Sequence, residues 1–125
     1  MIKVKAIIPD GKFQSLRVKG HADFAPGGQD LVCAGVSAVV IGGINALKHP
    51  ESFEIFQESG LAVIKLKPKE EITNYDATVI NTILDQLETI QQSYGKYITL
   101  NYHSRKENYL LYDLDLISPL ISTDL

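Results

Sequence analysis

A single cysteine and a histidine upstream of it are the residues of this chain whose types could do chemistry together. Cys33 is the only cysteine of the 125 residues, and His21 lies twelve positions before it, across a stretch that contains glycines. A thiol becomes a nucleophile when a base takes its proton and when nearby N–H groups or positive charge stabilise the thiolate. If Asp30 caps a helix, Cys33 is the third helical residue, close to unpaired N–H groups and to the positive end of the helix dipole. This spacing is compatible with a Cys33 nucleophile that has His21 as its base, and by itself it does not establish the pair.

Four further residues are candidates for supporting this pair or for binding a substrate. Asp30 either caps the helix with its carboxylate or also orients the histidine. Ser37 lies one helical turn beyond the cysteine, so its hydroxyl points either towards the site or back to a carbonyl of its own helix. Gly27 and Gly28 let backbone approach closely, leave room for an extended peptide and permit movement on binding.

Simpler roles compete with catalysis at these positions. A lone cysteine in an apolar helix is usually a small buried hydrophobic residue, and a lone histidine usually lies at the surface. Asp30 fits a plain helix cap better than a third catalytic member, and the glycine pair could form only a turn. A metal site built from His21, Asp23, Asp30 and Cys33 is disfavoured, because structural zinc sites use paired cysteines or histidines at short spacing. The glycine loop also lacks the lysine of a P-loop. Neither a metal nor an organic cofactor is expected.

Composition describes an ordinary soluble globule with one domain. Hydrophobic residues make up 45% of the chain and charged residues 22%, and one cysteine excludes an internal disulfide. The net charge of −3, with basic residues scattered singly or in small groups such as Lys65, Lys67 and Lys69, argues against nucleic-acid binding. The start of the chain lacks the apolar region of a signal peptide, and the apolar run at 36–47 is too short to span a membrane. We therefore expect a cytoplasmic protein with neither nucleic acid nor membrane as a partner.

The elements that must position these residues alternate between strands and helices. Alternating apolar residues predict strands, with Lys3 and Lys5 on the wet side of the first. The run 31–47 is apolar nearly all round, which predicts a helix buried on most sides, and its small residues should let a neighbouring element approach closely. The expected order is ββαββαβ, an α+β fold with two helices packed on a mainly antiparallel sheet. The strands are expected at 2–8, around Leu16 and Val18, and at 52–58, 61–67 and 96–102.

The second helix has the clearest pattern. Thr73 and Asp76 resemble a capping box at its start, and Gly95 stands where it should stop. Its apolar residues recur at three- and four-residue steps, which predicts a stripe facing the core. The members of that stripe are Tyr75, Val79, Ile80, Ile83, Leu84, Leu87, Ile90 and Tyr94.

The residues after 102 differ in character from the rest of the chain. Residues 104–108 are polar and linker-like, whereas 109–121 alternate leucine, isoleucine and tyrosine with aspartate. We expect a domain over 1–102 and a C-terminal extension over 103–125. The extension would add a strand or short helix, or pack on a partner subunit.

Two motifs resemble one known family. The first motif is Gly20-His21-Ala22, and the second, across the glycine loop, is the run from Gln29 to Ser37 (Gln-Asp-Leu-Val-Cys-Ala-Gly-Val-Ser). Together they are similar to the paired motif of the ribosomal-processing cysteine protease Prp family. The resemblance covers about residues 1–102. Gly35 stands where that family commonly has alanine, and the segment after about residue 103 extends beyond a typical member.

The resemblance implies an endopeptidase that removes a short N-terminal extension from a large-subunit ribosomal protein, number twenty-seven. Cys33 would be its nucleophile and His21 its general base and acid, while Asp30 and Ser37 match family positions in or beside the site. The loop 22–29 would be a mobile substrate cover. The resemblance further implies a homodimer, an α+β fold and no cofactor.

Two other functions would use the same residues. A non-enzymatic, ribosome-associated module would hold a peptide in the same cleft without cleaving it. A redox-sensing thiol protein would oxidise Cys33 reversibly and control a partner through it. The binding module would show peptide affinity without product and would be indifferent to alkylation of the thiol. Mass spectrometry of a candidate peptide substrate would separate the redox sensor from a protease.

Overall fold

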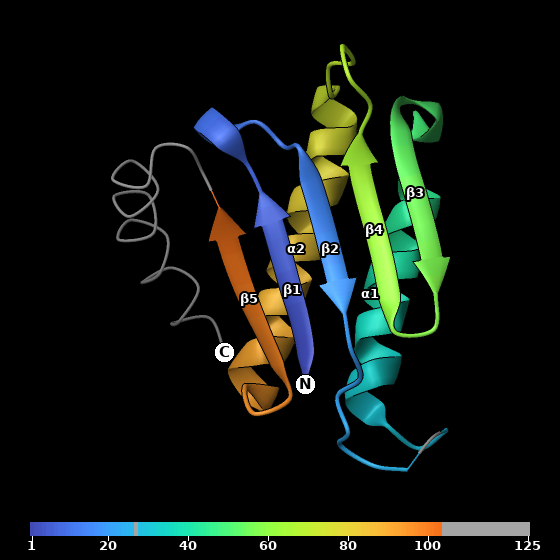
Figure 1. Ribbon diagram of the computed structural model, residues 1–125, viewed down its shortest axis with the longest axis vertical. Helices are drawn as coiled ribbons and strands as arrows, with labels where there is room; N and C mark the ends of the chain where they lie inside the picture. The colour runs from blue at the N-terminus through green and yellow to red at the C-terminus, as the bar shows by residue number, and fades with distance from the viewer. Residues whose placement is uncertain (27, 104–125) are drawn as a thin grey trace.

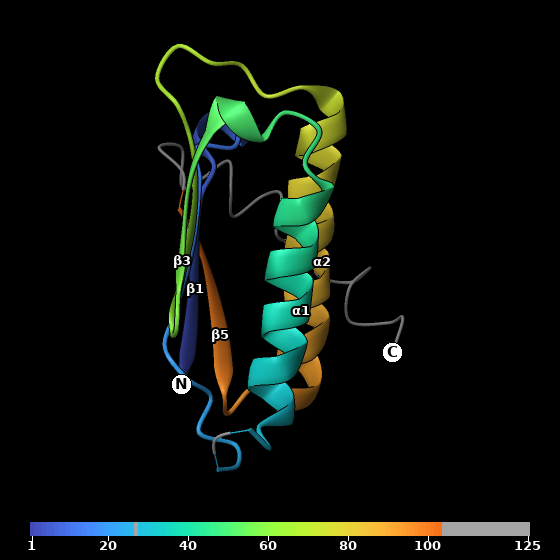
Figure 2. The same cartoon turned by 90° about the vertical axis from the view of Figure 1, so that its right-hand side faces the viewer.

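The computed structural model describes residues 1–26 and 28–103, which form one sheet with two helices on one of its faces (Figures 1 and 2). The predicted α+β fold and the ββαββαβ order are confirmed. The elements are β1 (Ile2–Ile7), β2 (Ser15–Lys19), α1 (Leu31–Ala46), β3 (Phe53–Glu58), β4 (Leu61–Leu66), α2 (Asn74–Tyr94) and β5 (Ile98–His103).

The sheet has the strand order β3-β4-β2-β1-β5. All neighbours are antiparallel except β1 and β5, which are parallel because the chain crosses back over the sheet before β5. Alternation sets the two faces: Val4 and its partner Val18 are buried under the helices, whereas Lys3 and Lys5 are exposed on the other face, as predicted. Figure 2 shows that the helices cover only one face.

Helix α1 is less buried than its composition predicts. One row of residues four apart, Val32, Val36, Val40 and Ile44, faces the sheet. Burial on most sides is wrong, because nothing in the described part of the chain covers the outward side of a two-layer fold. Ile41 on that side is 44% exposed.

The close approach expected from the small residues of α1 does occur. The two helices pack side by side on the sheet, and a side chain at Gly43 would overlap the Ile83 side chain of α2. Glycine at this position therefore lets α2 lie against α1, which keeps both helices on the same face of the sheet.

Helix α2 begins as predicted, with the Thr73 hydroxyl accepting the Asp76 N–H at 3.2 Å. The capping box is incomplete, because the Asp76 carboxylate instead accepts the backbone N–H groups of Lys48 at 2.7 Å and His49 at 3.0 Å. Asp76 is 1% exposed, and it ties the exit of α1 to the start of α2. The apolar stripe packs on the core except for Tyr75, which is 55% exposed and lies under the Lys48 ammonium.

Gly95 follows the last residue of α2 and ends the helix there. Strand β5 continues to His103, and the predicted extension after that residue lies outside the described residues, as does Gly27. Within residues 1–26 and 28–103, neither helix is long and apolar enough to cross a membrane.

Candidate active site

Asp30 builds the start of α1, as the sequence predicted. Its extended backbone places the carboxylate over the first turn, where Oδ1 accepts the Cys33 N–H at 2.9 Å. The second oxygen, Oδ2, accepts the Phe24 N–H at 2.9 Å, so Asp30 also holds the preceding loop against the helix. The hydrogen bond from the Cys33 backbone, and next that from Phe24, lower the pKa of Asp30, while burial acts in the opposite direction. In the described part of the chain no hydrogen bond joins Asp30 to His21.

Cys33 lies in the first turn of α1 with its sulfur half-buried. The backbone N–H of Ala22 donates to Sγ at 3.3 Å. Ala22 directly follows His21, so the segment carrying the histidine also approaches the sulfur. Nucleophilic cysteines commonly lie at a helix start and near polar hydrogen-bond donors. The structure therefore gives Cys33 two of the features that a nucleophilic cysteine needs.

His21 lies just beyond β2, on a backbone fixed by the turn between β3 and β4. The Gly20 N–H donates to the Gly60 carbonyl at 2.8 Å. Gly60 has a φ of +78°, and a Cβ built there would lie 2.7 Å from His21 Nε2. The exposed imidazole thus rests on a glycine that has no room for a side chain.

A hollow of about 560 Å³ brings His21, Cys33 and Ser37 to one surface. Ser37 lies on the exposed side of α1, one turn after Cys33, so the prediction that it faces the site is supported by its place in this wall. The opposite wall is the β3–β4 turn, from Gln57 to Ala62. The thiol, the imidazole and the hydroxyl therefore line one shared hollow.

The loop before α1 is pinned at Phe24. The Phe24 ring meets Tyr94 and Tyr97 edge-on, with centroid distances of 5.6 and 5.1 Å. These two tyrosines lie at the end of α2 and just before β5. Gly28 has a φ of +82°, a conformation that favours glycine, whereas the predicted role of Gly27 lies outside the described residues. The aromatic contact fixes one point of the loop that was expected to cover the substrate.

Two parts of the site were not predicted. The Ala22 N–H at the sulfur and the Gly60 turn under His21 join segments that are 11 and 39 residues apart in the sequence. Glu58-Ser59-Gly60 is recognisable as a turn, but no sequence signal links it to the histidine. Pairing of β2 with β4 creates that contact.

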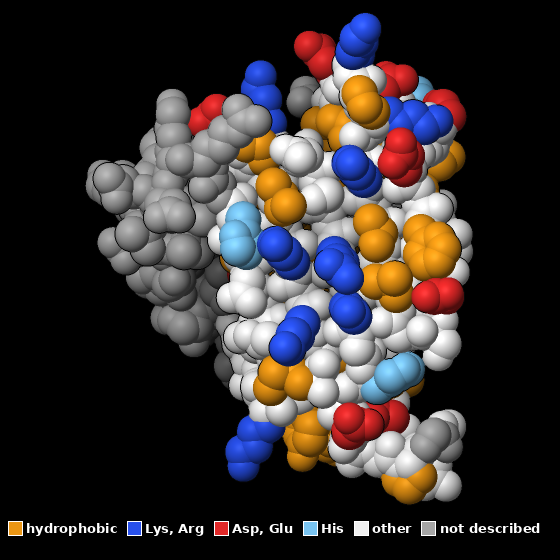
Figure 3. Space-filling model, in the orientation of Figure 1, with side chains coloured by type: hydrophobic (Ala, Val, Ile, Leu, Met, Phe, Trp, Pro, Cys, Tyr) orange, Lys and Arg blue, Asp and Glu red, His pale blue; other side chains and the backbone are white. Residues whose placement is uncertain are grey.

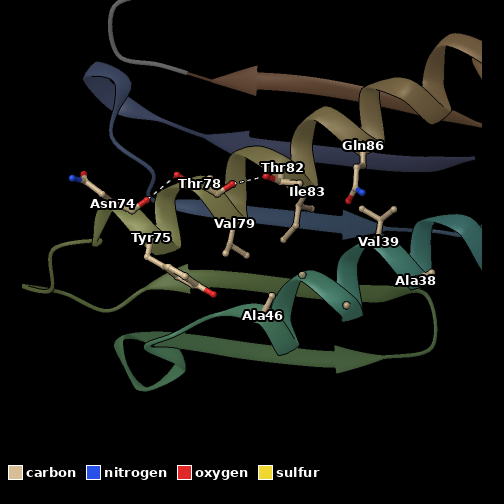
Figure 4. Close-up of a pocket in the computed structure, with 12 residues that line it drawn as sticks. Ala38, Val39, Ala46, Asn74, Tyr75, Thr78, Val79, Thr82, Ile83 and Gln86 are labelled. Carbon is tan, nitrogen blue, oxygen red and sulfur yellow. Dashed lines mark hydrogen bonds between the residues drawn. The ribbon is translucent and has the colours of Figure 1, made fainter. Parts of the chain in front are cut away.

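A larger hollow of about 950 Å³ lies between α1 and α2, away from the cysteine (Figure 4). Its wall on α1, from Ala38 to Ala46, is apolar, and its wall on α2 mixes polar residues such as Thr78 with apolar ones such as Val79 and Ile83. It contains neither cysteine, histidine nor carboxylate. Within the described residues no group of three or more His, Cys, Asp or Glu side chains is placed to hold a metal ion. Of the two hollows, the smaller one therefore contains the cysteine and the histidine.

Comparisons with known proteins agree on one family. The family model of cysteine protease Prp matches residues 1–99. The ribosomal processing cysteine protease Prp of Staphylococcus aureus (strain Mu50 / ATCC 700699) is 32% identical over 105 residues, covering 82% of this chain and 99% of that protein. The protein of the same name from Mycoplasma genitalium is 36% identical over 89 residues, covering 71% of this chain and 88% of its own length.

Solved structures show the same relationship. The S. aureus protease in complex with a covalently linked product peptide has a TM-score of 0.74 and 33% identity, over 82% of this chain and 100% of the other. The same protease with a substrate peptide has a TM-score of 0.66 and 31% identity over the same shares. The family model matches residues 1–99, which include both motifs, both helices and the first four strands. This chain therefore belongs to the cysteine protease Prp family.

Proposed function

We propose that this chain is an endopeptidase that removes the short N-terminal extension of a large-subunit ribosomal protein, number twenty-seven, with Cys33 as nucleophile and His21 as general base and acid. The observation that carries the proposal is the hollow shared by Cys33 and His21, in which the sulfur receives the Ala22 N–H. The S. aureus relative, crystallised with substrate and covalently linked product peptides, supports a peptide substrate.

In the first half of the reaction, His21 takes the Sγ proton and the sulfur attacks the scissile carbonyl carbon. The carbonyl oxygen becomes an oxyanion. Because the Cys33 N–H is donated to Asp30 and the Ala22 N–H to the sulfur, the oxyanion donors are the N–H groups of Leu31 and Val32 at the helix start. The C–N bond then breaks, and His21 gives its proton to the departing amine, which is the new N-terminus of the substrate.

In the second half, water hydrolyses the thioester between Cys33 and the removed extension. His21 takes a proton from the water, and the water oxygen bonds to the thioester carbon. The C–S bond then breaks, His21 returns the proton to the sulfur, and the extension leaves with a carboxylate. Asp30 acts in this scheme as a positioning residue, since both of its oxygens accept backbone N–H groups. Ser37 and Gly28, in the hollow wall and the loop respectively, contact the extended substrate beside the reacting bond.

The test is cleavage of the extended precursor of that ribosomal protein, followed by mass spectrometry of both products. Wild type should cut the precursor once, and the larger product should be the ribosomal protein with its mature N-terminus. Cys33→Ala should make no cut while keeping the wild-type circular dichroism spectrum. Binding of the precursor by wild type without any product would instead fit the peptide-binding module. Undiminished cleavage by Cys33→Ala would exclude the proposed nucleophile.

We also propose that the protein forms a homodimer in the cytoplasm, as the resemblance implies, through the outward face of α1. That face offers exposed apolar surface at Ile41 and along the α1 wall of the larger hollow. A Cβ built at Gly42 meets no atom within 4 Å, so Gly42→Glu starts from open space and places a charge on this face. We expect sedimentation to show a dimer for wild type and for Ser93→Glu, an exposed position on α2 outside the hollow, and a monomer for Gly42→Glu. A dimeric Gly42→Glu variant would exclude this face.

A further inference from the structure

The open face of the sheet carries a cluster of positive charge, which we call the basic face: Lys3 and Lys5 on β1, and Arg17 and Lys19 on β2. Figure 3 shows Lys and Arg side chains gathered over the middle strands, with acidic side chains at the margins of the view. The sequence alone suggests scattered basic residues. Antiparallel pairing of β1 with β2 brings these four together.

The pairing places like charges directly opposite each other. Lys3 is the cross-strand partner of Lys19, and Lys5 is that of Arg17. Such pairs lie about 5 Å apart across the sheet and about 7 Å apart along a strand, a spacing at which like charges repel. The chain as a whole carries a net charge of −3, so the cluster does not follow from an excess of basic residues.

Within residues 1–26 and 28–103, no ion pair joins a member of the basic face to a carboxylate. Strands β1, β2, β4 and β5 contain neither aspartate nor glutamate, and the acidic residues of the sheet, Glu54 and Glu58, lie on the edge strand β3. Glu54 is opposite Lys65 rather than opposite a member of the basic face. Within the described residues, the ion pairs are Met1 with Asp23 and His49 with Glu51. An arrangement that costs the free protein stability points to an anionic partner.

We infer that the basic face binds the phosphate backbone of RNA. Four cations spread over two strands suit a chain of phosphates rather than one phosphate group. The neighbouring Thr99 and Asn101 of β5 supply hydrogen-bonding groups. Beside the cations the same face carries apolar side chains, Leu61 and Val63 on β4 and Phe56 on β3, of which Phe56 is 50% exposed. An exposed aromatic ring next to cations suits an unpaired base that stacks while its phosphates meet the cations. The choice of RNA over other polyanions rests on the proposed function, because a ribosomal substrate is presented beside ribosomal RNA.

The basic face adjoins the catalytic hollow. Lys19 precedes His21 by two residues, and its partner on β4, Leu61, lines the hollow together with Gly60. RNA held across β1 and β2 would therefore end at the mouth of the site. Binding there would bring the protease to an extension that projects from an assembling particle, without requiring RNA to touch the reacting groups.

The test measures binding of a fluorescently labelled single-stranded RNA of about 20 nucleotides by anisotropy at several salt concentrations. Each cation that releases a counterion from single-stranded nucleic acid contributes about −0.7 to the slope of log affinity against log salt, so four give about −2.8. Wild type should therefore lose about fifty-fold in affinity between 50 and 200 mM salt.

The test variant is Lys3→Glu with Arg17→Glu, which turns both like-charge pairs into opposite-charge pairs and so keeps the sheet intact. The matched control, Lys69→Glu with Lys96→Glu, makes the same change in net charge at exposed positions off the face. At 50 mM salt we expect RNA affinity to fall by at least about twenty-fold in the first and by less than about three-fold in the second.

Three results would each overturn the inference. The two variants lose equal RNA affinity, wild type binds no RNA at 50 mM salt, or wild type binds phosphatidylserine vesicles more tightly than RNA at the same salt. Both variants should cleave the free extended precursor at the wild-type rate. If the wild-type protein binds RNA but does not cleave the precursor, the proposed function is wrong and the basic face is not. If it cleaves the precursor but does not bind RNA, the inference about the basic face is wrong and the proposed function is not.

Discussion

The contact between His21 and Gly60 makes Gly60→Ala an informative perturbation. The new Cβ would lie 2.7 Å from Nε2 and 3.2 Å from Cε1 of the imidazole. Ordinary van der Waals contact begins near 3.4 Å, so the ring must move by about 0.7 Å or more. Because His21 is exposed, its ring can swing outward without disturbing the core. We therefore expect the substitution to displace the base while the fold persists.

Two effects of the substitution must be separated. Alanine at a φ of +78° strains the backbone by about 1 kcal/mol, whatever surrounds it. Gly11 is the matched control, since it has a φ of +77° and no atom within 4 Å of a built Cβ. Gly60→Ala and Gly11→Ala should therefore lose similar free energies of unfolding in urea. A base displaced by most of an ångström should lower kcat/KM about 10- to 100-fold in Gly60→Ala alone.

The assay is kcat/KM for cleavage of the extended precursor by wild type and by both alanine variants. We expect Gly11→Ala to remain within about two-fold of wild type, because it bears the same backbone strain far from the site. Equal kcat/KM values for the two variants would refute the reasoning, since the contact under His21 would then have no part in placing the base.

Three other residues give predictions that do not depend on the substrate. Backbone hydrogen bonds lower the pKa of Asp30, so the stability that its carboxylate contributes is present above the unfolded pKa of 3.8 and is lost as the pH falls through the lower folded pKa. Between about pH 5 and pH 2.5, the free energy of unfolding in urea should fall more for wild type than for Asp30→Asn, and equal falls would contradict this. Asp76→Ala leaves two N–H groups unsatisfied and should cost roughly 2–5 kcal/mol in urea unfolding, with Asp76→Asn between it and wild type; a loss below about 1 kcal/mol would show that water replaces the carboxylate. Burial, and next the 2.6 Å hydrogen bond to Glu88, raise the pKa of Tyr102 above the ordinary 10.0, so Tyr102 should not ionise near pH 10. The tyrosinate absorbance change near pH 10 should therefore be the same in Tyr102→Phe as in wild type, and a smaller change in the variant would contradict this.

The sequence was a good guide wherever the contacts are local. The Asp30 cap and the Cys33 N–H are three residues apart, and the Thr73 cap and Asp76 are likewise three apart, so both helix starts were predictable from spacing. Alternation in β1 and β2 predicted their buried faces for the same reason, because each strand's pattern depends only on its own residues.

Contacts between distant segments were not predictable. The position of Gly60 under His21 depends on the register of β2 with β4, and the Asp76 bonds to Lys48 and His49 depend on how α1 and α2 meet. Burial of α1 was predicted wrongly because composition shows how apolar a helix is and not how many neighbours it has. The basic face arose in the same way, since Lys3 and Lys19 become neighbours only when β1 and β2 pair.

The measurement that tests the central claim most directly is the intact mass of the protein during turnover. The chain is mixed with the extended precursor, quenched in acid within the first turnover and weighed by mass spectrometry. If Cys33 is the nucleophile, wild type should gain the mass of the removed extension, less one water, as a thioester that hydroxylamine releases, and Cys33→Ala should gain nothing and form no product. Product formed by Cys33→Ala, or an adduct that maps to another residue, would contradict the account.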